Sequence, residues 1–185
     1  MSASLLFPDT QPLRFVMNNY ETLYEALSGS SSCTLTNTSS NIPDASGKFK
    51  IKPDSGTFTV NGGVNTTCSG SPGKPAAVIF VDGDLNITND LIYSRPTVFI
   101  VSGQIEINQT VDEVDAVLIS NGTFSDAPGG GFDNLLTVKG SIIGALDGPL
   151  GSRVFLNRKV SSGNFLSEHI ILQPSYFYYL TDYAG

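Results

Sequence analysis

The chain has 185 residues, of which 40% are hydrophobic and 15% are charged, and its formal net charge is −7 at pH 7. The apolar fraction suffices for one domain with a real core, and the abundant Gly, Ser, Thr and Asn exclude a helix bundle or a disordered chain. With 10 Lys and Arg against 17 Asp and Glu, the chain lacks the cations that nucleic-acid phosphates or an anionic membrane surface would need, so neither partner is expected.

The first predicted element is an amphipathic helix over residues 13–27. Its apolar residues recur with helical spacing and share one face. The expected contact residues are Leu13, Val16, Met17, Tyr20, Tyr24 and Leu27. Packing of this helix on its own domain is favoured over binding of a partner protein. A loop rich in Ser, Thr, Asn and Gly follows, up to residue 47.

Five segments between residues 57 and 145 then align on a glycine, at intervals of about 20 residues. The aligned glycines are Gly62, Gly83, Gly103, Gly122 and Gly140. Each is expected to make the sharp bend between two strands of one coil. The intervening stretches 89–96 and 110–115 are expected to be turns. This pattern predicts an all-β fold, a right-handed parallel β-helix of five to six coils.

Apolar residues fill the same positions around each glycine. The position four residues before the glycine holds Phe58, Ile79, Phe99, Leu118 and Leu136, and the position two residues after it holds Val64, Leu85, Ile105, Phe124 and Ile142. These positions share one parity and therefore one strand face, so stacked coils would bury each position as a continuous column. Two other folds have regularly spaced strands but fit less well. The consensus sequence of leucine-rich repeats is absent, and a β-sandwich would not need the same apolar positions in every coil.

The opposite strand face is also apolar, and the residues expected to point outward are Val78, Phe80, Val98, Ile100, Val117, Ile119 and Leu135. An exposed patch of that size is a liability in a monomer, so it needs a cover. Helix 13–27 is the expected cover, and a partner chain is the alternative. The chain is thus expected to be a single domain with an N-terminal helix and loop cap over 1–47, coils over 48–160 and a C-terminal cap over 161–185.

No catalytic site is predicted. The carboxylates of Asp82, Asp84 and Glu106 fall in different columns, whereas glycosidases need two at a fixed separation. A polysaccharide lyase or hydrolase therefore remains only an alternative. His169 is the one histidine; no Gly-x-Ser-x-Gly motif accompanies it, and a capping role is expected.

Calcium is the only cofactor for which the sequence offers candidate ligands. Asp82 and Asp84 flank a glycine, and the acidic residues Asp112, Glu113 and Asp115 lie close together in sequence. Both groups lack the further spaced oxygen ligands of a dedicated calcium loop and are typical of solvated turns. They are weak calcium candidates, and no other cofactor is expected.

The composition looks extracellular, although residues 1–9 lack the basic start of a signal peptide. A mature or excised fragment is the expected explanation. The two cysteines, Cys33 and Cys68, form either one disulfide or two unrelated thiols. No apolar run approaches the roughly 20 residues of a membrane span, so membrane insertion is not expected.

Residues 77–179 resemble a β-helical domain found near the C-terminal end of large surface proteins of small-genome bacteria. The resemblance rests on Val78-Ile-Phe-Val-Asp-Gly-Asp-Leu-Asn-Ile-Thr88, Phe99-Ile-Val-Ser-Gly-Gln-Ile-Glu-Ile107, Leu135-Leu-Thr-Val-Lys-Gly-Ser-Ile-Ile-Gly144 and Ser167-Glu-His-Ile-Ile-Leu-Gln-Pro-Ser-Tyr176. It implies an extracellular, envelope-attached setting and brings no catalytic residues. The region before residue 48 departs from this family.

The predicted function is a non-catalytic structural or adhesive module at the cell surface. It would act as a rigid spacer or display platform of a surface or pilus-type assembly, with other domains or neighbouring subunits as its partners. A glycan-binding or polysaccharide-degrading β-helix is one alternative. A self-assembling filament or surface-layer subunit is another.

Overall fold

The computed structural model describes residues 24–25, 41–65, 70, 74–127, 134–144, 154–159 and 167–176. This part of the chain is mostly β and contains no helix of seven or more residues. Its strands are β1 (Ile42–Pro43), β2 (Gly47–Ile51), β3 (Thr57–Val60), β4 (Val64–Asn65), β5 (Ala77–Val81), β6 (Asp84–Ile87), β7 (Thr97–Val101), β8 (Ile105–Ile107), β9 (Glu113–Val114), β10 (Val117–Ser120), β11 (Phe124–Asp126), β12 (Leu136–Ile143), β13 (Val154–Phe155) and β14 (Glu168–Leu172).

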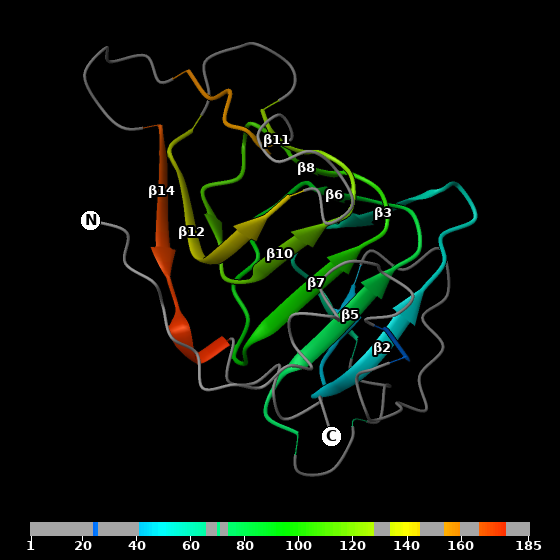
Figure 1. Ribbon diagram of the computed structural model, residues 1–185. Helices are drawn as coiled ribbons and strands as arrows, with labels where there is room; N and C mark the ends of the chain where they lie inside the picture. The colour runs from blue at the N-terminus through cyan, green and yellow to red at the C-terminus, as the bar shows by residue number, and fades with distance from the viewer. Residues whose placement is uncertain are drawn as a thin grey trace, which may run out of the picture.

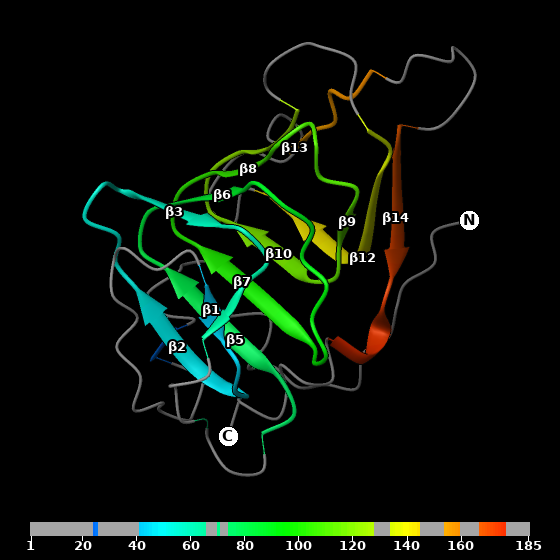
Figure 2. The same cartoon turned by 180° about the vertical axis from the view of Figure 1, so that it is seen from behind.

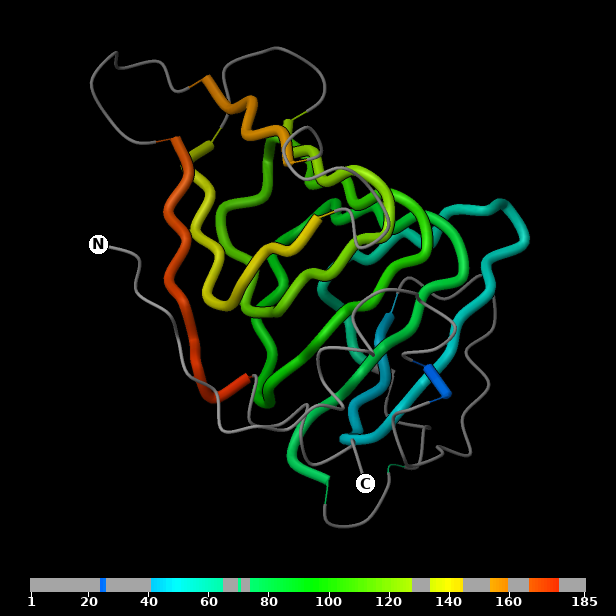
Figure 3. The backbone as a smooth tube through the Cα atoms, in the orientation of Figure 1, coloured from blue at the N-terminus to red at the C-terminus, as the bar shows by residue number. Residues whose placement is uncertain are grey.

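The strands form two all-parallel sheets, an arrangement consistent with a β-helix or solenoid (Figures 1 and 2). One sheet has the order β14-β12-β10-β7-β5-β2, with β9 pairing β12, and the other has the order β13-β11-β8-β6-β3. A separate parallel pair joins β1 and β4. Two neighbouring parallel strands must be joined by a crossover connection. Here each connection between neighbouring strands of one sheet contains a strand of the other sheet. The chain therefore winds from β5 through β6 to β7 and onward, as the backbone trace shows (Figure 3).

The three central coils have the register that the glycine alignment predicted. Aligned partners are Ile79, Phe99 and Leu118 on β5, β7 and β10, and Leu85, Ile105 and Phe124 on β6, β8 and β11. All six side chains are at most 1% exposed. The prediction that stacked coils bury apolar columns is confirmed for these coils.

The register predicted for the first coil is wrong. Phe58 lies on β3 and pairs with Leu85 of β6, whereas Phe49 of β2 takes the predicted place beside Ile79. Both strands of a coil alternate inward and outward with the same parity, so the period alone cannot tell the first strand from the second. Gly62 therefore lies one corner further along its coil than predicted, between β3 and β4.

The alignment on Gly140 is also wrong. Strand β12 passes a corner without a turn, so its first five residues pair with β14 and its last three pair with β10. Leu118 consequently pairs with Ile142 and not, as predicted, with Leu136. The change of partner falls at Gly140, so this glycine marks the corner before the strand that pairs with β10, whereas Gly83, Gly103 and Gly122 mark the corner after such a strand.

A third row of short pairings completes the coils. Leu91 forms an isolated bridge with Val114 of β9, and Val114 pairs in turn with Val138 of β12. All three side chains are fully buried. The prediction that 89–96 and 110–115 are turns is therefore wrong at these two inward residues. Strands of one or two residues have no period that a sequence could reveal.

The outward apolar face of β5, β7 and β10 is covered, whereas Leu135, predicted to belong to it, precedes β12 and is 48% exposed. The covered side chains are at most 1% exposed and cluster with Tyr24 and Tyr176. Tyr24 packs edge-on against Phe80, with ring centroids 4.9 Å apart. Lys48 and Lys50 of β2 place their Nζ atoms 4.5 and 4.7 Å from the Tyr24 ring centroid. Residues 24 and 25 are helical, and the rest of the predicted helix, with Leu13, Val16, Met17, Tyr20 and Leu27, lies outside the described residues.

Three of the predicted turn glycines stack at one corner of the coils. The N–H of Gly103 donates to the carbonyl of Gly83, and the N–H of Gly122 donates to the carbonyl of Gly103, both at 2.9 Å. A Cβ on Gly122 would lie 2.8 Å from the Gly103 oxygen. The coils approach so closely at this corner that only glycine fits without a shift of the backbone.

The paired strands extend from Ile42 to Leu172. Cys33 and Cys68 lie outside the described residues. Within the described ranges, no helix has the length and apolar character needed to cross a membrane.

Candidate functional site

One inward column of the solenoid ends in a carboxylate. Asp126 is the last residue of β11 and pairs with Ile107 of β8, which in turn pairs with Ile87 of β6. Ile87 and Ile107 are fully buried, and so is Asp126. A buried carboxylate in an apolar column is costly unless a charged or hydrogen-bonding partner compensates for its lost hydration.

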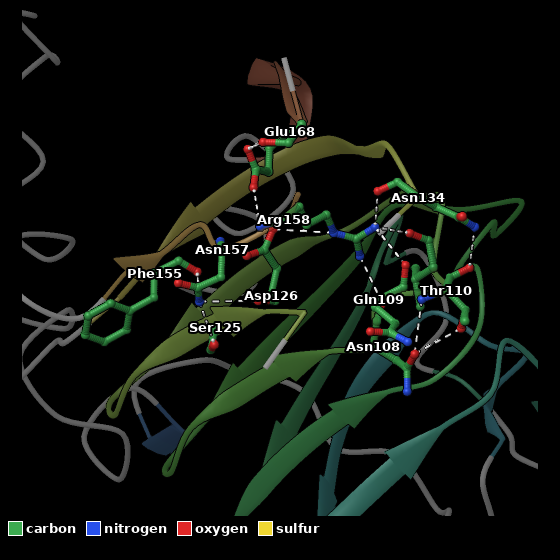
Figure 4. Close-up of polar contacts among 12 residues, drawn as sticks. Asn108, Gln109, Thr110, Ser125, Asp126, Asn134, Phe155, Asn157, Arg158 and Glu168 are labelled. Atoms are coloured by element: carbon green, nitrogen blue, oxygen red, sulfur yellow. Dashed lines mark hydrogen bonds and ion pairs between the residues drawn. The ribbon is translucent and has the colours of Figure 1, made fainter. Parts of the chain in front are cut away.

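Arg158 supplies that compensation from a segment just after β13 (Figure 4). Its Nε lies 3.4 Å from Oδ2 of Asp126, and both side chains are 0% exposed. Its two terminal nitrogens donate to backbone carbonyls at 2.7 to 3.4 Å, those of Asn108, Gln109, Val111 and Asn134. One guanidinium group therefore ties together loops that belong to successive coils.

The surroundings of the Asp126 carboxylate shift its pKa in opposite directions. Burial raises its pKa from 3.8 to about 6; the neighbouring Glu168 carboxylate also raises it, whereas the Asn157 N–H and Arg158 lower it. The Asn157 N–H donates to Oδ1 at 2.5 Å. Glu168 is held in place by the N–H of Arg158, which donates to its Oε1 at 3.1 Å.

The raised pKa of Asp126 predicts a pH-dependent stability. The folded state binds the proton more tightly than the unfolded state, so this group's contribution is complete below about pH 4 and is lost as pH rises through about 6. A shift of about two pKa units corresponds to about 3 kcal/mol. We expect the unfolding free energy, measured by urea denaturation between pH 4 and 7, to fall by up to about that amount through Asp126.

The matched variant for this measurement is Asp126→Asn, which keeps the side-chain shape and removes the titration. Subtracting its unfolding free energy from that of the native protein at each pH cancels the carboxylates that do not interact with Asp126, so the difference reports Asp126 together with its neighbour Glu168. The difference should fall between pH 4 and 7. A difference that stays constant, or rises with pH, would contradict a raised pKa.

The polar groups of this cluster bind one another and the backbone of neighbouring coils. The Arg158 guanidinium is engaged by carbonyls and Asp126, and both oxygens of Glu168 accept hydrogen bonds, from the Arg158 N–H and from the Ser167 hydroxyl. A general acid or nucleophile needs access to a substrate atom. Here the charges face one another and the backbone of the coils.

Each carboxylate that the sequence offered for catalysis interacts with a neighbouring group of the protein. Asp82 lies 3.6 Å from the exposed ammonium of Lys52. Asp84 accepts the N–H of Gln104 at 2.9 Å, and the Gln104 side chain reaches Glu106 at 3.4 Å. Asp84 and Glu106 are thus linked through Gln104 as part of a polar ladder along the coils.

In the 112–115 turn, the carboxylates of Glu113 and Asp115 each interact with another side chain, those of Lys139 and Tyr176. The N–H groups of Asp112 and Glu113 donate to Oδ1 of Asp90 at 2.7 and 3.1 Å. Glu113 forms an ion pair with Lys139. Within the ranges that the structure covers, no three His, Cys, Asp or Glu side chains gather where they could hold a metal ion.

A shallow polar hollow of about 420 Å³ lies at another corner of the coils, lined by Asn61, Gly62, Thr88, Asn89, Asp90 and Thr110. Much of its lining is already used for coil-to-coil contacts. The Thr88 hydroxyl donates to Val60 O at 3.1 Å, and the Asp90 carboxylate accepts backbone N–H groups of the next coil. Fewer donors and acceptors of the lining residues are therefore available to a ligand than the polar lining indicates.

Sequence reasoning missed the Asp126–Arg158 pair, although one signal was present. Asp126 has the same parity as Phe124 and follows it by two residues, so the pattern already placed it inward. Nothing in the sequence identified Arg158, because its partners are mostly backbone carbonyls from distant loops. His169 lies exposed on β14, aligned with Thr137 of β12.

Comparisons with known proteins identify no relative. No protein-family model, no curated protein and no solved structure matches this chain.

Proposed function

We propose that this chain is a non-catalytic structural module of the cell surface, a right-handed parallel β-helix of five to six coils. It acts as a rigid spacer or display platform within a surface or pilus-type assembly. Its partners are other domains of a larger surface protein or neighbouring subunits. The resemblance of residues 77–179 to β-helical domains of bacterial surface proteins supports the extracellular setting.

The observation that carries this proposal is how the buried charges are used. Arg158 and Asp126 are the charged residues buried in the described chain, and they hold the loops of successive coils together. The apolar columns beneath them run continuously through the central coils. A scaffold stabilised in this way favours a mechanical role, because its buried polar groups rigidify the fold.

The proposal is tested by a turnover screen and by location. The purified protein is incubated with a panel of plant, bacterial and animal polysaccharides, and new reducing ends and unsaturated uronic acids are measured. We expect no product with any polymer and expect antibodies against the chain to label intact host cells. Turnover of any polymer, or labelling only after the cells are lysed, would contradict the structural role.

A further inference from the structure

The described chain contains two Asn-Gly dipeptides, Asn61-Gly62 and Asn121-Gly122. In such a dipeptide the backbone nitrogen of the glycine can attack the side-chain amide carbon of the asparagine, because glycine has no side chain to hinder the approach. The attack closes a five-membered succinimide ring and releases ammonia, and water then opens the ring to aspartate or isoaspartate. Because the two dipeptides have the same reacting atoms, the fold decides how fast each one reacts.

Asn61 lies at the corner between β3 and β4, where its reacting atoms are accessible. It is exposed and lines the polar hollow of about 420 Å³, so water can reach its side chain. Among the described residues, no hydrogen bond holds the Gly62 N–H. The nitrogen that must attack is therefore free to approach the side-chain carbon.

A backbone donor also faces the oxygen of Asn61 on which negative charge develops during the attack. The N–H of Gly63 donates to Oδ1 of Asn61 at 3.2 Å. This hydrogen bond folds the side chain back over its own backbone. A donor in this position stabilises the oxyanion of the tetrahedral intermediate. The corner thus both positions the amide group and favours attack on it.

Asn121 differs from Asn61 in each of these respects. Its own N–H donates to the Val101 carbonyl at 2.9 Å. The Gly122 N–H donates to the Gly103 carbonyl, also at 2.9 Å. Oδ1 of Asn121 is buried and has no donor within the described ranges. The neighbouring coil therefore holds the attacking nitrogen, and the reaction must wait until this corner opens locally.

We propose that Asn61 is a site of spontaneous deamidation, whereas the stacking of the coils protects Asn121. The bond from Gly62 N to Cγ forms, the bond from Cγ to Nδ2 breaks, and the Gly62 amide proton leaves with the ammonia. No enzyme, oxidant or partner is needed, so the modification does not depend on the proposed surface role. The product adds a carboxylate to the hollow that Asp90 also lines. Because ammonia is lost, the modified fraction grows with the age of the protein.

The test compares the two sites within one molecule. The whole chain is incubated in its native state at pH 8 and 37 °C in water enriched in oxygen-18, and peptide mapping by mass spectrometry follows aspartate and isoaspartate at each site. We expect Asn61 to react at least about tenfold faster than Asn121, because attack at Asn121 first breaks a hydrogen bond between coils. The product at Asn61 should carry one oxygen atom from the solvent.

Incubation of the same chain in guanidinium chloride is the control, since neither dipeptide is then protected and the two sites should react at similar rates. Asn61→Gln, whose longer side chain would have to close a six-membered ring, should abolish the fast reaction in the native state. If native Asn61 reacts no faster than Asn121, the inference is overturned. A difference that persists in the denaturant would also overturn it, because the neighbouring sequence and not the fold would then set the rates.

Discussion

Replacement of Arg158 by Met should cost about 3–5 kcal/mol of unfolding free energy at pH 7.5, as expected when one partner of a buried ion pair is removed. The variant keeps an unbranched chain of similar length but leaves the carbonyls of Val111 and Asn134 without the donor that lies 2.7 Å away. It also removes the cation that lowers the pKa of Asp126, so the buried carboxylate loses its charged partner. Urea denaturation followed by circular dichroism measures the loss.

The pH dependence of that loss separates its two causes. Below pH 5 Asp126 is largely protonated, because burial raises its pKa to about 6, so the uncompensated charge disappears and only the unpaired carbonyls remain. The cost of Arg158→Met should therefore be smaller at pH 4.5 than at pH 7.5. Adding Asp126→Asn to Arg158→Met should recover part of the stability at pH 7.5 but little at pH 4.5.

Lys52→Met is the matched control for this pair. Lys52 also faces a carboxylate, that of Asp82 at 3.6 Å, but its side chain is 81% exposed. Exposed ion pairs contribute about 0–1 kcal/mol, because water and salt screen them. If Arg158→Met and Lys52→Met lower the unfolding free energy equally, the hydrogen bonds from Arg158 to the carbonyls add no more stability than an exposed ion pair.

The central coils could be predicted because two independent signals agree there. Ile79, Phe99 and Leu118 share a parity and also lie at the same distance before a glycine, so the period and the turn fix one register. At both ends of the solenoid only one signal remains. Phe58 has the correct parity but follows the glycine corner of its coil, and β12 carries Gly140 inside a continuous strand.

The rest of the fold depends on contacts between distant residues, which produce no pattern in the local sequence. Leu91 and Val114 point inward from segments too short for a period, and only the neighbouring coils hold them in line. Sequence reasoning placed Asp115 in a calcium turn, whereas its described partner is the Tyr176 hydroxyl.

The second large effect concerns Phe99, which sits in the middle of the column that runs from Phe49 through Ile79 to Leu118 and is fully buried. Its truncation to Ala should cost about 3–5 kcal/mol, because the central coil is held on both sides and cannot collapse into the cavity. In a solenoid each coil contacts mainly its neighbours, so this one residue weakens two coil interfaces at once.

Phe155→Ala supplies the control for Phe99→Ala, since Phe155 lies on the last strand of its sheet and is 46% exposed. Its loss should be below about 1 kcal/mol, because half of the ring is already in water and only one neighbouring strand packs against it. The comparison measures how stability is distributed along the coils. If both variants lose the same free energy, the column through Phe99 is not the continuous core that holds the stack together, and the rigid-spacer role loses its structural basis.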